Sequence, residues 1–159
     1  MSANQNIKLG DLLIQKGWIA QGQLEQALAE QKVSREFLGE ILLKNHSITE
    51  EQLAIALSEQ FKMPFVRLKS AYLNWDLVMK FSTGLVMDHQ CFPLQSDGLT
   101  VTFAIINPLD AWVRAQIERE LHGKTVKLVL TTKSEMKDCL DRYRQYLNMK
   151  IRQSFDQKS

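Results

Sequence analysis

Two stretches near the start of the chain decide its fold: KLGDLLIQKGWIAQGQLEQALAEQ at residues 8–31 and FLGEILLKNHSITEEQLAIALSEQ at residues 37–60. They align without a gap, at a constant offset of 29 residues. A gapless repeat of this kind indicates one unit that has been duplicated. The residues shared at equivalent positions are Leu9, Gly10, Leu13, Leu24, Leu28 and Gln31 in the first copy and Leu38, Gly39, Leu42, Leu53, Leu57 and Gln60 in the second.

Each copy is predicted to form a helix, a turn and a second helix, because its apolar residues follow the three- and four-residue steps of a helix face. Gly17 suits the left-handed residue that ends a helix, and Thr49 with Gln52 forms a capping box that starts one. His46 stands where the first copy has Gly17 and is a costlier occupant of left-handed backbone. We expect the two copies to pack as one four-helix module, with Leu13, Leu28, Leu42 and Leu57 in its core.

The second half of the chain predicts a small α/β domain with mixed strands and two longer helices. Strands are expected at 65–68, 91–94, 99–106 and 126–130, and helices at 74–81, 111–121 and 134–147. Asn74 is a plausible cap, Gly84 should break the helix that follows it, and Asp97-Gly98 predicts a hairpin. The predicted fold class is α+β, with a helical repeat module at 1–62, the α/β domain at 63–147 and a fraying tail at 148–159.

Composition predicts a cytoplasmic protein that does not insert into a membrane. The 159 residues carry a net charge of +2, with 45% hydrophobic residues and two cysteines that lack C-x-x-C spacing. The N-terminus has no signal-peptide core, and no apolar run approaches the length of a transmembrane helix. From Lys124 onward basic residues outnumber acidic ones, which favours an anionic partner there or a solvated helix face.

Catalytic machinery is not visible in the sequence. Gly123-Lys124-Thr125 resembles the end of a phosphate-binding loop, but Glu118 occupies the position of the leading glycine, and the segment should join a helix to a strand. The three histidines, His46, His89 and His122, have no metal-ligand spacing, and no nucleophile motif is present. We therefore predict a protein that is not an enzyme and has no catalytic residue, metal or cofactor. The acidic second helices of the repeat disfavour DNA as a partner.

The tandem pattern resembles the motif of the MshEN domain, [RK]-L-G-x-x-L-x-x-x-G-x(6)-L-x-x-x-L-x-x-Q, with a five-residue spacer that corresponds here to residues 32–36. Downstream, MPFVRL, CFPL and NPLD are similar to the rest of the N-terminal region of type II secretion and type IV pilus ATPases, without the motor. The resemblance implies a bacterial regulatory module that binds cyclic di-GMP, with one half of the ligand on each copy, and that acts on a secretion or pilus component.

Guanine recognition needs a cation at O6 and N7 and a carboxylate at N1 and N2. Lys8, Asp11 and Glu40 could supply these groups, and small glycines would let the backbone approach the ligand. The resemblance implies as ligand-binding residues Lys8, Leu9, Gly10, Asp11, Leu13, Gly17, Leu24, Leu28, Gln31, Phe37, Leu38, Gly39, Glu40, Leu42, Leu53, Leu57 and Gln60.

Phe37 is the main departure from the motif, since it stands where a second Arg or Lys is usual. It could stack on a base, or it could be a core residue beside Leu38 and Ile41. Lys8 also lacks the two-pronged donor geometry of Arg. Two hypotheses therefore stay open: a cyclic di-GMP sensor, or a protein–protein interaction adaptor of a secretion or pilus machine that has lost nucleotide binding.

Overall fold

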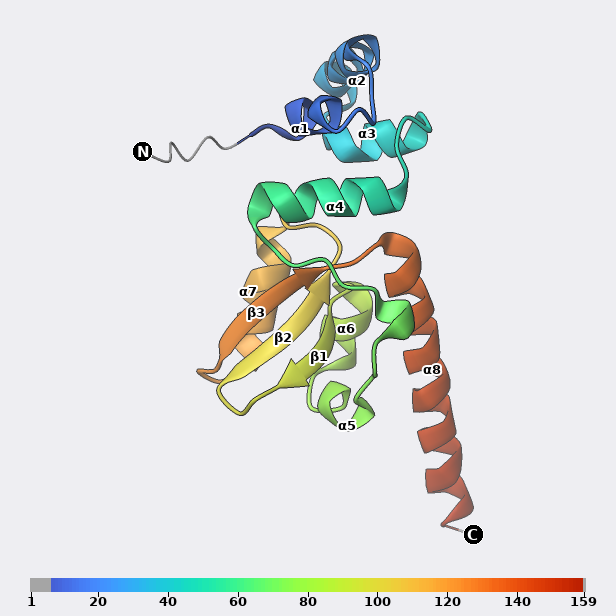
Figure 1. Cartoon of the computed structure of the whole chain (residues 1–159). Coiled ribbons are helices and arrows are strands. Elements are labelled where there is room, and N and C mark those ends of the chain that lie inside the picture. The colour runs from blue at the N-terminus through green and yellow to red at the C-terminus, as the bar shows by residue number, and fades with distance from the viewer. Residues whose placement is uncertain (1–6, 159) are drawn as a thin grey trace. The chain divides into compact units, whose positions relative to one another are not determined.

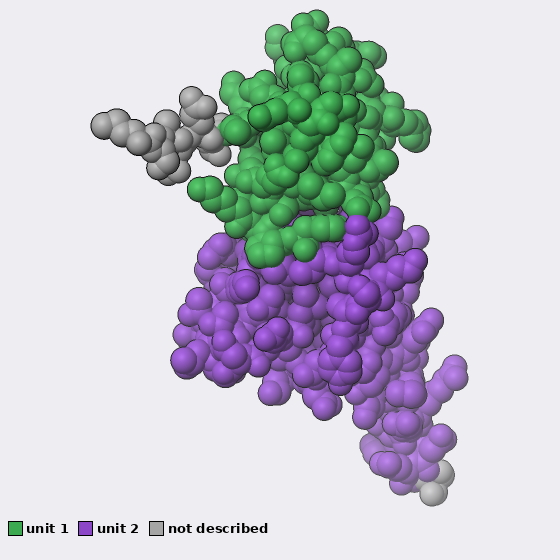
Figure 2. Space-filling view, in the orientation of Figure 1, with its two compact units in different colours: residues 1–65 green, residues 66–159 purple. Residues whose placement is uncertain are grey.

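The structure is a computed structural model that describes residues 7–158. The chain divides between Phe65 and Val66 into two compact units, which we call unit 1 and unit 2 (Figure 2). The boundary predicted from the sequence follows Lys62. Within residues 7–158, no helix combines the length and apolar character needed to cross a membrane.

Unit 1 contains the duplicated helices. In the first copy α1 spans Leu9–Gln15 and α2 spans Gln21–Ser34; in the second, α3 spans Leu38–Lys44 and α4 spans Glu50–Phe61 (Figure 1). The helices of the second copy start at the positions that the repeat offset predicts. Residues from both copies, including Leu13 and Ile19 with Leu42 and Ile48, form one buried cluster. The prediction of a single helical unit is confirmed.

The turn inside each copy has the same backbone geometry. Gly17 has φ +72° and His46 has φ +54°, so both residues are left-handed. The N–H of Trp18 donates to the carbonyl of Leu13 at 3.0 Å, and the N–H of Ser47 donates to that of Leu42 at 2.9 Å. The predicted left-handed turns are confirmed, and His46 bears the steric cost that Gly17 avoids.

The start of the second helix is also duplicated. In α4 the Thr49 hydroxyl accepts from the Gln52 N–H at 3.1 Å, and the Gln52 side chain accepts from the Thr49 N–H at 2.9 Å, which confirms the capping box. In α2 the Gln23 side chain accepts from the Ala20 N–H at 2.8 Å. The first copy therefore keeps the half of the box that does not need a hydroxyl.

Unit 2 is built on a three-stranded sheet with the order β1-β2-β3 (Figure 1). Strands β1 (Phe92–Ser96) and β2 (Thr100–Ile105) are antiparallel, whereas β2 and β3 (Thr125–Leu130) are parallel and are joined through α7 (Ala111–Glu120). The remaining elements are the 3-10 helix η1 (Leu68–Ser70), α5 (Trp75–Val78), α6 (Thr83–Asp88) and α8 (Lys133–Asp156). The fold class α+β is confirmed.

Local turn chemistry accounts for the hairpin between β1 and β2. Gly98 has φ +95°, and the carboxylate of Asp97 accepts from the backbone N–H groups of Thr100 at 2.7 Å and Leu99 at 3.1 Å. These hydrogen bonds lower the pKa of Asp97. The predicted Asp-Gly hairpin is therefore confirmed, with strands that begin and end within two residues of the expected positions.

Three local predictions between residues 65 and 84 are wrong. Residues 65–68 form no strand beyond a single-residue bridge at Phe65, because the chain turns into η1 after the Val66 N–H has bonded to Leu130. The helix expected at 74–81 ends at Val78, although Asn74 caps it as predicted. Gly84 lies inside α6, which the Ser82 hydroxyl starts by accepting from the Leu85 N–H at 3.2 Å.

The first half of α8 is part of the core of unit 2. Its residues Met136, Leu140 and Tyr143 are buried with Phe92 of the sheet. Trp75 stacks on Tyr146, with ring centroids 5.0 Å apart. The helix then continues to Asp156, well past the end predicted near residue 147.

Candidate functional site

The Leu-Gly pair of each copy is explained by helix packing. Gly10 and Gly39 are buried, and a Cβ at Gly10 would lie 2.6 Å from Leu24 Cδ1, while one at Gly39 would lie 2.7 Å from Leu53 Cδ1. Both separations are far below van der Waals contact, so the absence of a side chain allows the two helices of a copy to meet. These glycines thus have a structural role that does not require a ligand.

Lys8 and Phe37 occupy equivalent positions at the start of the first helix of each copy. Lys8 has φ −66° and ψ 146°, and Phe37 has φ −66° and ψ 141°. Their carbonyls accept from Leu12 and Ile41, at 3.1 and 3.2 Å. Lys8 is exposed and Phe37 is 52% exposed. The interpretation of Phe37 as a core residue is therefore wrong, and its ring is available to a ligand.

Leu28 and Leu57 hold the same repeat position but differ in burial. Leu57 is 8% exposed, whereas Leu28 is 39% exposed, so the prediction that Leu28 belongs to the core is wrong. The physical reason is that the packed face of α2 is narrow: only Leu24 and Ala27 of this helix are buried, and Leu28 lies at the edge of that face. The exposed Leu28 gives unit 1 an apolar side chain that a flat ligand could contact.

The predicted carboxylates and amides lie on or near the surface. Asp11 is exposed in the first turn of α1, and Glu40 is half-buried in the first turn of α3. The Gln31 amide donates to the carbonyl of Glu36 at 3.0 Å, so it holds the spacer that leads to Phe37. Gln60 is half-buried. Gln31 therefore has a positioning role within the protein.

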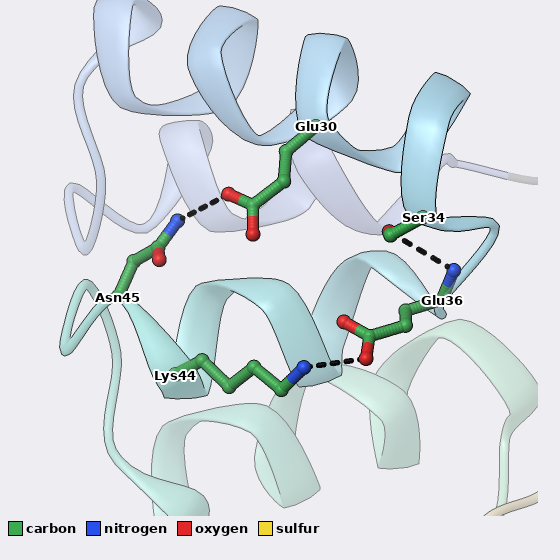
Figure 3. Close-up of polar contacts among 5 residues, drawn as sticks. All are labelled: Glu30, Ser34, Glu36, Lys44 and Asn45. Carbon is green, nitrogen blue, oxygen red and sulfur yellow. Dashed lines mark hydrogen bonds and ion pairs between the residues drawn. The ribbon is translucent and has the colours of Figure 1, made fainter.

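The two copies exchange polar contacts at equivalent positions. Lys16 of the first copy forms an ion pair with Glu59 of the second, with 2.5 Å between Nζ and Oε1. Asn45, the repeat counterpart of Lys16, donates to Glu30, the counterpart of Glu59, at 3.1 Å (Figure 3). Correspondingly, α1 contacts α4 and α2 contacts α3. Reciprocal contacts of this kind are the mark of a two-fold relation between two like units.

A further ion pair holds the end of the spacer, residues 32–36, against the second copy. The Lys44 ammonium pairs with the Glu36 carboxylate, and the Glu36 N–H donates to Ser34 at 3.3 Å (Figure 3). The hydrogen bond to Glu36 raises the pKa of Lys44. Sequence spacing did not reveal this pair or the cross-copy pairs, because their partners come together only when the helices have packed.

Burial sorts the predicted ligand-binding residues into two groups. Six are buried and support packing: Gly10, Leu13, Leu24, Gly39, Leu42 and Leu57. Eleven retain exposed or partly exposed surface: Lys8, Leu9, Asp11, Gly17, Leu28, Gln31, Phe37, Leu38, Glu40, Leu53 and Gln60. A ligand of unit 1 would be recognised by the second group.

Unit 2 shows no arrangement typical of phosphate-loop chemistry at Lys124. Its Gly123-Lys124-Thr125 segment follows α7 and enters β3, the helix-to-strand order that the sequence indicated. Across residues 7–158 no cluster of three or more His, Cys, Asp or Glu side chains could hold a metal ion. Cys91 and Cys139 are buried free thiols, and burial raises the pKa of each to about 12.

Comparison with known proteins links the chain to one family. The sequence-family model of the MshEN domain matches residues 61–148, which are more than half of the chain. The matched residues lie mostly in unit 2 and do not include the repeat. The type IV pilus assembly ATPase PilB of Myxococcus xanthus is 24% identical over 136 residues, which is 86% of this chain and 24% of that protein. The PilB of Thermus thermophilus is 45% identical over 62 residues, 39% of this chain and 7% of that protein. The chain thus spans a quarter or less of these relatives.

Solved structures resemble nearly all of the chain. A structure of MshE with cdg, an abbreviation of cyclic di-GMP, has a TM-score of 0.78 and 28% identity, and the match covers 86% of this chain and 99% of that one. The N-terminal domain of XpsE has a TM-score of 0.66 and 17% identity, with 89% and 98% covered. The second similarity concerns the fold alone.

Proposed function

The chain belongs to the MshEN domain family, and we propose that it is a non-enzymatic regulatory module whose unit 1 binds cyclic di-GMP. The similarity of the fold to MshE with cdg supports this ligand. Cyclic di-GMP is a ring of two guanylates related by a two-fold axis. The observation that carries the proposal is the two-fold exchange of contacts in unit 1, Lys16 with Glu59 and Asn45 with Glu30, because it relates the two copies in the way that the two guanylates of the ligand are related.

The chemistry of the two halves is unequal. At the first copy the Lys8 ammonium donates to guanine O6 and N7, and the Asp11 carboxylate accepts from N1 and N2. At the second copy Glu40 is the equivalent carboxylate, but Phe37 replaces the cation. Because its ring is 52% exposed, Phe37 offers a face for stacking in place of a charge-assisted hydrogen bond. One guanine is therefore bound by charge and the other mainly by apolar contact.

The relatives suggest where in the cell the module acts and with which machine. Two of them are type IV pilus assembly ATPases, which supports a role in the cytoplasm beside a pilus or secretion machine. The chain itself hydrolyses no ATP in this proposal and needs no metal or cofactor. Ligand on unit 1 would change how the module engages its protein partner.

Calorimetry of the purified protein with cyclic di-GMP tests the proposal. Saturable binding is expected, with much weaker binding of cyclic di-AMP, which has the same charge and symmetry but no O6 acceptor. Lys8→Ala should weaken binding, whereas Lys124→Ala, a matched loss of one exposed cation in unit 2, should not. If folded protein binds neither dinucleotide, the adaptor function takes the place of sensing, and unit 2, which carries the family match, becomes the surface to study.

A further inference from the structure

The second half of α8 extends the buried face of the helix into solvent. Met136, Leu140 and Tyr143 are buried in unit 2, and Leu147 packs beside them. Figure 1 shows α8 continuing beyond the sheet and the other helices of unit 2. The next side chains of the row, Ile151 and Phe155, are 54% and 71% exposed. Within residues 7–158, this apolar helix face therefore stays largely open to solvent over its last two turns.

This face is a narrow row. Residues four apart on a helix lie about 40° from each other, so Leu147, Ile151 and Phe155 form one ridge. Met149 is also exposed, but it projects about 160° away from Ile151. On that side a shallow hollow is lined by Met149 and by the polar residues Gln145, Asn148, Arg152, Gln153 and Asp156. A ridge one residue wide fits the groove of another helix, whereas a helix lying on a membrane needs a broad apolar face.

The flanks of the ridge are basic. Lys150 and Arg152 lie about 100° to either side of Ile151. Lys158 comes two residues after the end of the helix at Asp156. The acidic residue of this segment, Asp156, lies about 140° from Ile151. An antiparallel pair of two copies centred on Ile151 would place the two Lys150 side chains together on one flank and the two Arg152 side chains together on the other, which is repulsive. A second copy of the chain is thus a poor occupant.

We propose that residues 147–158 dock an acidic amphipathic helix of a partner protein. Its apolar side chains would pack against the ridge of Leu147, Ile151 and Phe155, and its carboxylates would pair with Lys150 and Arg152, as flanking charges do in coiled coils. This surface is separate from the dinucleotide site of unit 1 and does not depend on it.

A designed peptide tests the proposal on the full chain. The probe is a fluorescein-labelled helix of about 20 residues, long enough to be helical, with a leucine row flanked by glutamates. Fluorescence anisotropy should show saturable binding that weakens as salt is raised. The double variant Ile151→Ser and Phe155→Ser should weaken binding by about tenfold or more, while Met149→Ser, an exposed apolar loss on the other side, should leave it unchanged. The same peptide with lysine in place of glutamate should also bind about tenfold or more weakly.

Several results would overturn the docking site. One is the absence of saturable binding by the acidic peptide, and another is an equal loss of binding in the Met149→Ser variant. Binding of the chain to phosphatidylglycerol vesicles that depends on Ile151 and Phe155 would replace the protein helix by a membrane. A dimer in sedimentation equilibrium that the double variant dissociates would replace it by a second copy. The substituted side chains are exposed, so circular dichroism should show the same fold in every variant.

Discussion

Gly10→Ala tests whether the Leu-Gly pair of the repeat exists to bring two helices together. A Cβ at this position would lie 2.6 Å from Leu24 Cδ1 and 3.0 Å from its Cδ2. Leu24 is 6% exposed, so its side chain has little room to move away. The substitution should therefore force the helices of the first copy apart or push Leu24 out of its rotamer.

The magnitude follows from two opposing effects. Overpacking of a buried site costs about 1–3 kcal/mol, and replacing a helical glycine by alanine returns at most about 1 kcal/mol. The free energy of unfolding of unit 1 should therefore fall by up to about 2 kcal/mol. Gly22 is the matched control: like Gly10 it is the second residue of its helix, but beyond its own helix backbone and chain neighbours no atom of residues 7–158 lies within 4 Å of its added Cβ. Gly22→Ala should stabilise unit 1 by about 0.4–1 kcal/mol.

Native-state hydrogen exchange of the α1 and α2 amides measures these changes in unit 1 separately from unit 2. A double-mutant cycle with Leu24→Ala isolates the clash, because a smaller side chain should accept the new methyl group and make the two effects non-additive. If Gly10→Ala and Gly22→Ala shift the exchange free energy by the same amount, the close approach does not explain the glycine.

Further predictions concern the ligand, the turn and catalysis. Lys8→Ala should weaken cyclic di-GMP binding in calorimetry, and Phe37→Arg should strengthen it by roughly ten- to hundredfold, the equivalent of a charge-assisted hydrogen bond of about 1.5–3 kcal/mol; no binding by either folded protein would end the sensing hypothesis. His46→Gly should raise the free energy of unfolding by about 1 kcal/mol in hydrogen exchange of unit 1, because it removes a side chain from left-handed backbone, whereas Gly17→Ala should lower it by a similar amount; opposite signs would contradict the turn assignment. Purified protein should not turn over ATP in a coupled assay, and an activity that vanishes in Lys124→Ala would refute the non-enzymatic proposal.

The helices of unit 1 could be predicted because several local signals agree in both copies. Apolar spacing, the left-handed turn at Gly17 and the capping box of Thr49 and Gln52 all indicate the same helix boundaries. The gapless duplication then transfers the helix boundaries of one copy to the other. The hairpin of unit 2 was predictable for a similar reason, since Asp97 and Gly98 satisfy the turn within a few residues.

Elements that depend on tertiary context were missed. Gly84 suggests a helix break, yet α6 forms around it because Ser82 caps the helix and Leu85 and Val86 are buried. Conversely, the segment Phe65-Val66-Arg67-Leu68 has strand-like composition but becomes a loop and the start of η1. The end of α8 was predicted near residue 147, although Ile151 and Phe155 continue the four-residue spacing of Leu147; this helical signal in the sequence was overlooked.

The sequence also could not predict which side chains of the candidate site are exposed to solvent. Leu28 and Leu57 are the same residue at the same repeat position, and only the packed structure distinguishes the exposed one from the buried one. The pairs Lys16 with Glu59 and Asn45 with Glu30 also required the reciprocal packing of the two copies, because each pair joins residues far apart in the chain.

The differences between the copies show where function can be tested. The glycines pack in the same way in both copies, with Gly10 and Gly39 against a leucine each, whereas Lys8 and Phe37 differ and are exposed. These packing contacts explain the glycines without a ligand, so a loss of stability in a glycine variant says nothing about binding. Phe37→Arg avoids this ambiguity, because the site is an exposed helix start with the same backbone as Lys8, and because damage to the fold cannot raise affinity. Tighter binding of cyclic di-GMP by this variant would therefore be evidence for a ligand shared between the two copies.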